Sequence, residues 1–168
     1  KRNLLSEIHL ITRQHLHRWA ATPAEIDVKE ASEIMLFIFF AGKILGCDEQ
    51  EALKLREHYK AFFRGFISFP INVPGTAFHA CLQGRKRGIK VIKEIFEKRK
   101  SCNKKKTNEQ DFLDTILEEV ENEEAPLTEA TAVDLVFFLL FAAYETTSSS
   151  ITLLFKYLTQ HPQVLRQL

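Results

Sequence analysis

The sequence has few of the residues that end helices or cross-link a chain. Its 168 residues include only six glycines and five prolines, which favours long helices over many short strands. The three cysteines, Cys47, Cys81 and Cys102, are odd in number and widely spaced, and no CxxC or Cys/His pattern surrounds them. A disulfide framework and a structural zinc site are therefore both disfavoured.

The chain also lacks an excess of charge of one sign. Its net charge is +1, so no global attraction to nucleic acid is expected. One basic run extends from Arg85 to Lys106 with eleven positive charges in 22 residues, and nine acidic residues between Glu109 and Glu129 could offset it. A solvated helix face explains this run better than a surface for nucleic acid or anionic lipid. The six histidines lack the i,i+4 spacing of a metal pair, so no protein-bound metal is predicted.

Apolar residues recur at steps of three and four along most of the chain, and no internal repeat or strand pattern is present. The sequence therefore predicts one all-α domain in which the segment IMLFIFFA (34–41) is buried on every side. Lysines 104–106 are expected to form a loop. The predicted helices cover residues 4–19, 28–45, 49–69, 77–100, 111–120 and 129–160.

The last of these helices is unusually long. Thr128 is a candidate N-cap, and no breaker follows before His161-Pro162, so the helix would extend for ~48 Å. Such a length is typical of a coiled coil, a membrane span or the central strut of a helical domain. No heptad repeat is sustained, and the apolar run 135–143 is far shorter than the ~20 residues that a bilayer requires. The sequence therefore predicts that this helix is the central strut of a helical domain.

Within this helix, the apolar run leads into the polar segment FAAYETTSSS (141–150). The helix could simply leave the core here. Alternatively, Ala142 and Ala143 leave room for a flat group, and Glu145 beside Thr146 forms a carboxylate–hydroxyl pair suited to proton delivery. A second pattern, the aromatic stripe Phe62, Phe66 and Phe69 with Ile71 and Val73, fits either core packing or the lining of an apolar pocket.

The segment AAYETT (142–147) resembles the oxygen-activation stretch in the central helix of cytochrome P-450 haem-thiolate monooxygenases. That stretch reads small, small, any residue, acid, Thr, Thr or Ser. FPINVPGTAFHACLQGRK (69–86) resembles the connector between two roof helices in the plant clan that oxidises brassinosteroids, gibberellins, abscisic acid and triterpenoids. DFLDTIL (111–117) and LTQHPQVLRQL (158–168) are also similar in order and spacing, so the resemblance covers essentially all of the chain.

The resemblance implies specific roles. Thr146 would hydrogen-bond the dioxygen at the haem iron and help deliver protons, and Glu145 would be the acid of the proton relay. Ala142 and Ala143 would pack against the haem face, although the family often has Gly at the second position, and Thr147 would support them. The roof of the substrate pocket would include Phe66, Phe69, Ile71 and Phe138.

The resemblance also implies that residues 1–168 are the middle helical segment of a P-450 domain, truncated at both ends. The haem-ligating cysteine loop and the Glu-x-x-Arg helix of the family are not in this sequence, so we expect the chain alone to be inactive. The whole enzyme would use haem, O2 and electrons from an NADPH-cytochrome reductase to hydroxylate an apolar steroid- or triterpenoid-like substrate. It would sit on the cytosolic face of the endoplasmic reticulum membrane, held by an N-terminal anchor outside this chain. The alternative is a truncated, non-catalytic helical interaction module that uses its basic face.

Overall fold

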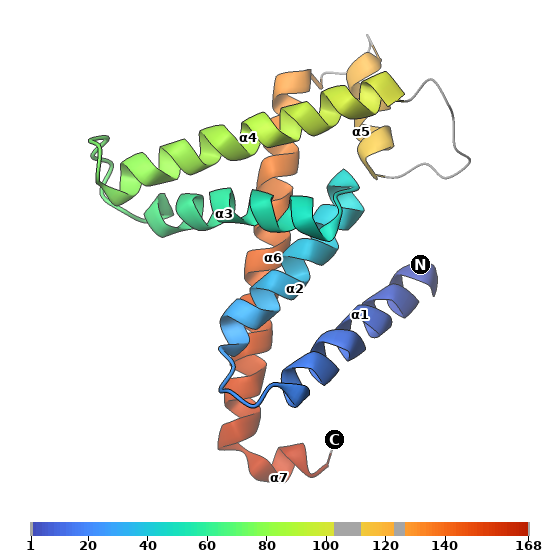
Figure 1. The fold of residues 1–168 in the computed structure, drawn as a ribbon, viewed down its shortest axis with the longest axis vertical. Coiled ribbons are helices and arrows are strands. Elements are labelled where there is room, and N and C mark those ends of the chain that lie inside the picture. Colours follow the sequence, from blue (N-terminus) through green and yellow to red (C-terminus); the bar gives the residue numbers. More distant parts are fainter. Residues whose placement is uncertain (1, 103–111, 123–126, 168) are drawn as a thin grey trace. The chain divides into compact units, whose positions relative to one another are not determined.

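The computed structural model describes residues 2–102, 112–122 and 127–167 (Figure 1). All regular elements in these ranges are helices, which confirms the all-α prediction. The expected loop at lysines 104–106 lies outside the described residues. The helices are α1 (Arg2–Ala21), α2 (Val28–Leu45), α3 (Glu49–Phe66), α4 (Ala77–Cys102), α5 (Phe112–Glu121), α6 (Glu129–Gln160) and α7 (Pro162–Leu165).

The helices form two compact units. The first, here called the hairpin unit, comprises Phe37–Ala143. The second, the terminal unit, comprises Lys1–Leu36 together with Tyr144–Leu168. The two divisions fall inside α2 and α6, each of which is one continuous helix.

The ends of α2 and the start of α3 follow the local sequence. The carboxylate of Asp27 accepts a hydrogen bond from the Glu30 amide at 3.0 Å at the start of α2. The helix stops at Gly46, whose φ of +68° is open to glycine at no steric cost. Asp48 then caps α3 and forms a capping box with Glu51, with hydrogen bonds of 2.8 and 3.2 Å. These boundaries confirm the sequence-based expectations.

The C-terminal end of α3 corrects one expectation. The helix ends at Phe66, whereas the sequence predicted that it would continue to Phe69. The hydroxyl of Ser68 donates to the Gly65 carbonyl at 2.6 Å and competes with the helical backbone bond. Phe69 precedes Pro70, which disfavours helical backbone angles for it. Phe69 therefore belongs to the connector rather than to the helix.

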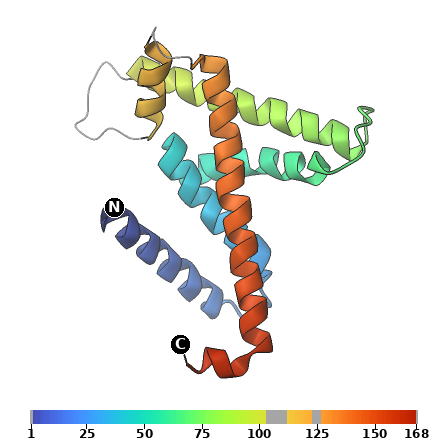
Figure 2. The same ribbon diagram turned by 180° about the vertical axis from the view of Figure 1, so that it is seen from behind.

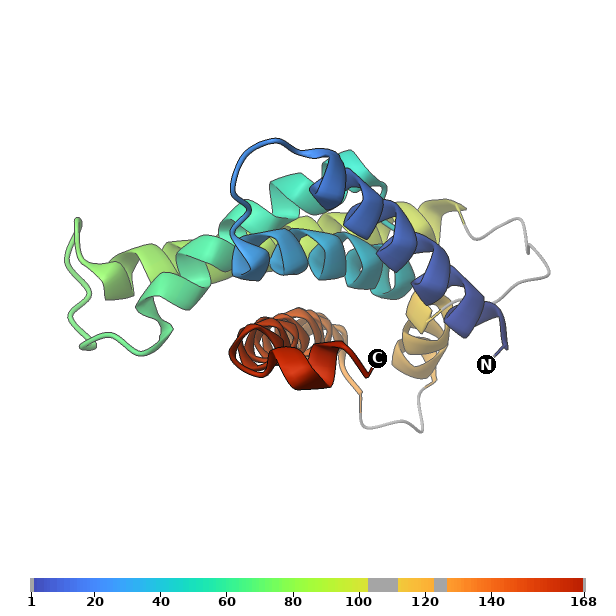
Figure 3. The same cartoon turned by 90° about the horizontal axis from the view of Figure 1, so that it is seen from below.

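Helices α3 and α4 lie side by side along their length (Figure 3). Glycine at position 84 permits this approach, since a Cβ there would lie 2.6 Å from the carbonyl oxygen of His58 and 2.7 Å from the amide nitrogen of Phe62. The connector turns at Gly75, with φ of +97°, and Thr76 accepts a hydrogen bond from the His79 amide at 3.2 Å to begin α4. The two helices form a hairpin with closely packed backbones.

The core of the hairpin unit is aromatic. The ring of Tyr59 stacks on Phe137 with centroids 4.5 Å apart, and it meets Phe37 edge to face at 5.1 Å. Helix α4 adds Ile92 and Phe96, which are both fully buried. Ile89, one turn before Ile92, is only half-buried.

Helix α6 is a single unbroken helix of 32 residues, as the sequence predicted (Figure 2). Thr128 caps it by accepting a hydrogen bond from the Thr131 amide at 3.2 Å. By length and composition alone this helix could cross a membrane. However, it carries the buried side chains of Phe137, Leu140, Tyr144 and Ser148. This burial favours a core helix, the central strut that the sequence predicted.

Residues 34–41 of α2 are less enclosed than expected. Met35, Phe37 and Ala41 are buried, while the other positions of the segment are half-buried. None of them is fully exposed. The segment is therefore buried on about one face, and the prediction that it is buried on every side is wrong.

Candidate functional site

One face of α6 is exposed along much of its length. The exposed positions recur every three or four residues, which places them on one stripe of a helix with 3.6 residues per turn. We call this stripe the open face of α6. It comprises Leu135, Phe138, Leu139, Ala142, Thr146, Ser150 and Leu153.

The open face brings two of the predicted site residues together. Ala142 and Thr146 are four residues apart, so their side chains lie one above the other. Ala143 and Thr147 lie on the adjoining face and are half-buried. A small methyl group next to a threonine hydroxyl leaves space for a flat ligand beside a polar group.

Glu145 occupies a different side of the same helix. Its carboxylate Oε1 lies 2.8 Å from the Nζ of Lys29, which is in the first turn of α2. The Glu145 side chain is only 15% exposed. A second carboxylate, Glu33, lies 3.2 Å from the same ammonium group.

Two serine hydroxyls complete this polar cluster. Ser148 and Ser149 each accept a hydrogen bond from Lys29 Nζ at 2.9 Å, and Ser148 is fully buried. Further along α6, Ser150 and Thr152 donate to backbone carbonyls one turn earlier, at 2.9 and 2.8 Å. The segment 145–149 therefore does not simply run out into solvent, because its acid and one of its serines are enclosed.

The aromatic stripe divides into two groups. In the hairpin unit, Phe62 lies 5.3 Å from Phe66, 6.2 Å from Phe138 and 5.3 Å from Phe141, measured between ring centroids. The predicted pocket residues Phe66 and Phe138 thus share one aromatic cluster, and each still exposes about half of its surface, at 52% and 43%. This cluster is both packed and accessible.

The other two predicted pocket residues lie in the connector between α3 and α4. Phe69 is 85% exposed and Ile71 is 55% exposed. The connector itself is ordered by hydrogen bonds from the Thr76 hydroxyl to the carbonyls of Ile71 and Val73, at 2.6 and 2.8 Å. Its apolar side chains are thus presented outward by a fixed turn.

Several cations of the basic run on α4 pair with nearby carboxylates. Arg85 pairs with Asp134 at 2.7 Å and Arg99 with Asp114 at 3.0 Å. Lys100 bonds to the Glu129 carboxylate, and this hydrogen bond raises the pKa of Lys100. Two of these partners, Asp114 and Glu129, belong to the acidic stretch that was expected to offset the charge of the basic run. Ion pairing along a helix face explains the run.

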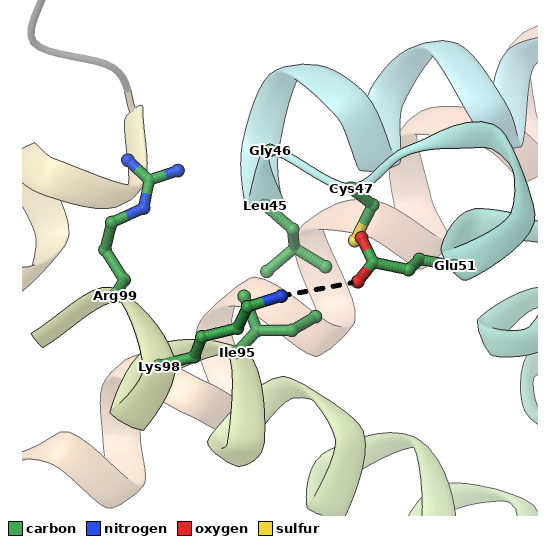
Figure 4. A pocket seen from close by; sticks show the side chains of 7 residues that line it. All are labelled: Leu45, Gly46, Cys47, Glu51, Ile95, Lys98 and Arg99. Carbon is green, nitrogen blue, oxygen red and sulfur yellow. Dashed lines mark ion pairs between the residues drawn. The ribbon is translucent and has the colours of Figure 1, made fainter. Parts of the chain in front are cut away.

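A small cavity of about 180 Å³ lies beside Cys47 in the hairpin unit (Figure 4). It is bordered by an ion pair in which Lys98 Nζ lies 3.7 Å from Glu51 Oε1. Burial, aided by the charges of Glu51 and Asp48, raises the pKa of the Cys47 thiol to about 11. Burial also raises the pKa of the Cys81 thiol.

Within residues 2–102, 112–122 and 127–167, no group of three or more His, Cys, Asp or Glu side chains could hold a metal ion.

Sequence reasoning missed Lys29 as a member of the site. It precedes Glu145 by 116 residues, and nothing in the first turn of α2 distinguishes it from an ordinary surface lysine. The serines were seen only as polar residues of α6. The signal that could have found the cluster is the packing of two helices, which a single sequence does not carry.

Comparisons with known proteins bear directly on this arrangement. The family described as Cytochrome P450 matches residues 21–168. Cytochrome P450 87A3 of Oryza sativa subsp. japonica is 38% identical over 96% of this chain and 31% of its own length. Cucurbitadienol 11-hydroxylase of Siraitia grosvenorii is 31% identical, and beta-amyrin 16-alpha-hydroxylase of Maesa lanceolata is 32% identical. Each of these two matches covers 100% of this chain and 35% of the relative.

The chain spans about a third of the length of these relatives. The match nevertheless covers most of the chain, including the whole of α6 and the connector after α3. On this evidence, the chain belongs to the cytochrome P450 family.

Proposed function

We propose that this chain is the distal and roof segment of a haem-dependent monooxygenase that hydroxylates a steroid- or triterpenoid-like substrate. The observation that carries the proposal is the open face of α6, where Ala142 and Thr146 lie one turn apart beside the enclosed carboxylate of Glu145. The names of two relatives, a cucurbitadienol hydroxylase and a beta-amyrin hydroxylase, support the substrate class.

The residues of this face fit a haem. A macrocycle is flat and largely apolar, and the open face offers it Ala142 together with the side chains of Leu135 and Leu139. In this proposal Ala142 and Ala143 lie against the macrocycle, and Thr147 supports the same turn. When bound, the haem would supply the activation of dioxygen. An iron-ligating thiolate would come from outside this chain, because the cysteine loop of the family is not among these residues.

The overall reaction explains why an acid and a hydroxyl belong here. Hydroxylation of a C–H bond consumes O2, two electrons and two protons, and it yields the alcohol and one water. The protons must reach a site from which bulk water is largely excluded. The Thr146 hydroxyl can donate a hydrogen bond and accept a proton in exchange, and the Glu145 carboxyl can carry a proton from the polar cluster.

The substrate would lie under the aromatic cluster and the connector. Phe66 and Phe138 offer accessible ring surface on a packed support, and Phe69 and Ile71 project from the connector. A rigid polycyclic terpenoid gains from such apolar contact, and few polar groups are needed to hold it. These four residues would therefore form the roof of the pocket.

The electrons would come from an NADPH-cytochrome reductase. The enzyme would lie on the cytosolic face of the endoplasmic reticulum membrane, anchored by a segment outside this chain. The alternative is a non-catalytic interaction module that uses the basic face. It is less well supported because Arg85, Arg99 and Lys100 of α4 are already paired with carboxylates within the hairpin unit.

Two measurements test the proposal. The full-length protein, supplied with reductase and NADPH, should convert a sterol or a triterpenoid alcohol into a product heavier by one oxygen atom, detected by mass spectrometry. The isolated 168-residue chain, mixed with haem and reduced under carbon monoxide, should give no thiolate-type Soret band. A full-length protein that binds no haem, or an isolated chain that gives this band, would contradict the proposal.

A further inference from the structure

The side chain of Lys29 is saturated by residues from one turn of α6. An ammonium group has three N–H donors. Lys29 directs them to the carboxylate of Glu145 at 2.8 Å and to the hydroxyls of Ser148 and Ser149 at 2.9 Å each. A surface ion pair uses one donor and leaves the others to water. Here one lysine ties together three side chains that belong to the predicted proton-delivery segment.

This lysine is itself fixed from the α2 side. The Glu33 carboxylate, one turn further along α2, lies 3.2 Å from the same Nζ. The Lys29 side chain is 31% exposed, compared with 15% for Glu145, so solvent reaches the cluster from the lysine side. The cluster therefore connects an enclosed carboxylate to the molecular surface of the terminal unit.

These contacts determine the direction in which the Glu145 side chain points. Consecutive residues of a helix are separated by about 100° around its axis. Thr146 lies on the open face, while Lys29 holds the Glu145 carboxylate toward the start of α2. Ser149 donates a long hydrogen bond of 3.5 Å to the same carboxylate oxygen. Lys29 and Ser149 contact the Glu145 carboxylate directly, and Ser148 shares the same ammonium group.

We propose that Lys29 is the positioning residue of the proton relay: it holds the Glu145 carboxyl in the enclosed cluster from which protons pass to Thr146. This inference rests on the proposed monooxygenase function and adds a residue on another helix to it. Loss of Lys29 leaves a largely buried carboxylate without its cation, and such a group leaves its position or takes up a proton. Either change uncouples proton delivery from electron supply, so that reducing equivalents are spent without product.

The test is a double-mutant cycle in the full-length enzyme with Lys29→Met and Glu145→Gln. The measured quantity is the amount of hydroxylated product per NADPH consumed. We expect Glu145→Gln to lower this ratio, and Lys29→Met to lower it by about tenfold, because a misplaced catalytic group costs that much or more. We expect the double variant to be no worse than Glu145→Gln alone, since both changes disable one step. Lys29→Arg, which keeps the charge, should retain most of the ratio.

A matched control separates positioning from support of the fold. Lys100→Met breaks another ion pair to α6, at Glu129 near the start of the helix. It should lower the thermal midpoint as Lys29→Met does, yet leave the product per NADPH unchanged. An independent readout without turnover is the infrared carboxylate band of Glu145, obtained as the difference between the wild-type protein and Glu145→Gln. This band should shift in Lys29→Met and stay in place in Lys100→Met.

The outcomes distinguish failure of the proposed relay from failure of the positioning role of Lys29. If Glu145→Gln leaves the product ratio unchanged, the proposed relay is wrong and the role of Lys29 falls with it. If Glu145→Gln lowers the ratio while Lys29→Met changes neither the ratio nor the infrared band, the relay stands and the positioning role of Lys29 is overturned. Additive losses in the double variant would overturn it as well.

Discussion

Glu145 and Thr146 are consecutive residues of α6 that face different surroundings: Glu145 is paired with Lys29 at 2.8 Å, whereas Thr146 lies on the open face. A carboxylate and a hydroxyl that are neighbours in sequence are thus separated around the helix. Proton transfer between them requires either rotation of the Glu145 side chain or a bridging water. In the proposed relay, this separation would let the acid exchange protons with the surface while the hydroxyl serves the reaction.

The Thr146 hydroxyl should be required for productive use of electrons. In the full-length enzyme, Thr146→Ala is expected to lower the product formed per NADPH on the order of 100-fold, the usual contribution of a positioned proton donor. Thr146→Ser keeps the hydroxyl and should retain most of the ratio. Product can be quantified by mass spectrometry and NADPH by absorbance.

The control for this variant is Thr128→Ala. It removes the N-cap of α6 and should cost about 1 kcal/mol of stability, seen as a lower thermal midpoint. Its product ratio should equal that of the wild type. A Thr146→Ala enzyme that also keeps the wild-type ratio would remove Thr146 from the mechanism.

The aromatic cluster should contribute to substrate affinity. Phe66→Ala and Phe138→Ala each remove accessible ring surface, and each should raise the Kd for a triterpenoid substrate about tenfold, because burial of such a side chain is worth about 1.5 kcal/mol or more. Phe155→Ala is the matched control, since nine residues along α6 place it opposite Thr146. Affinity can be measured by equilibrium binding to the full-length protein, and equal effects of all three variants would argue against a pocket at this cluster.

The sequence was most informative where the determinants are local. The Thr128 cap was predicted and is confirmed. Gly46 and the capping box of Asp48 and Glu51 lie at the predicted end of the helix 28–45 and the predicted start of the helix at 49. Each of these features depends on residues within a few positions of one another. The uninterrupted pattern from 129 to 160 likewise predicted the length of α6. These features follow from interactions between residues that are close in sequence.

The sequence-based predictions failed where a distant or competing contact determines the end of a helix or the direction of a side chain. The α3 helix ends early because the Ser68 hydroxyl takes the Gly65 carbonyl, which a hydrophobic pattern does not register. The site residues of α6 were predicted from a family motif, but the direction of the Glu145 side chain depends on a lysine 116 residues away. Which face of a helix a side chain serves is set by the packing of its neighbours.

The hydroxyl of Tyr59 should stabilise the hairpin unit. It donates a 3.0 Å hydrogen bond to the backbone carbonyl of Phe137 in a fully buried setting. Tyr59→Phe leaves that carbonyl without this donor and should lower the free energy of unfolding by about 1 to 2 kcal/mol. Tyr157→Phe, at an exposed position of α6, should change it by less than about 0.5 kcal/mol. Denaturant unfolding of the full-length protein measures both, and equal losses would show that the buried bond adds nothing.

Cys47 should react slowly with alkylating agents at neutral pH. Its pKa is raised to about 11, mainly by burial and further by the charge of Glu51, and only the thiolate is a nucleophile. In the native protein the rate of carbamidomethylation at Cys47 should therefore keep rising through pH 9 and 10, whereas in denaturant it should level off near the ordinary pKa of ~8.5. Because the folded state holds the proton more tightly, this group's contribution to stability is complete below the unfolded pKa and is lost as pH rises toward 11.

Glu51→Gln tests the contribution of the Glu51 charge to the raised pKa of Cys47. Glutamine can still serve in the capping box, but it removes the charge that raises the thiol pKa after burial. The variant should alkylate faster than the wild type at any pH between 8 and 10, with peptide mapping used to follow Cys47 apart from the other two cysteines. Burial is the larger cause, so the rate should still remain below that of the denatured chain. A native rate that levels off near pH 8.5 would mean that water reaches the thiol freely, and the cavity beside Leu45 and Ile95 would then have to open in solution.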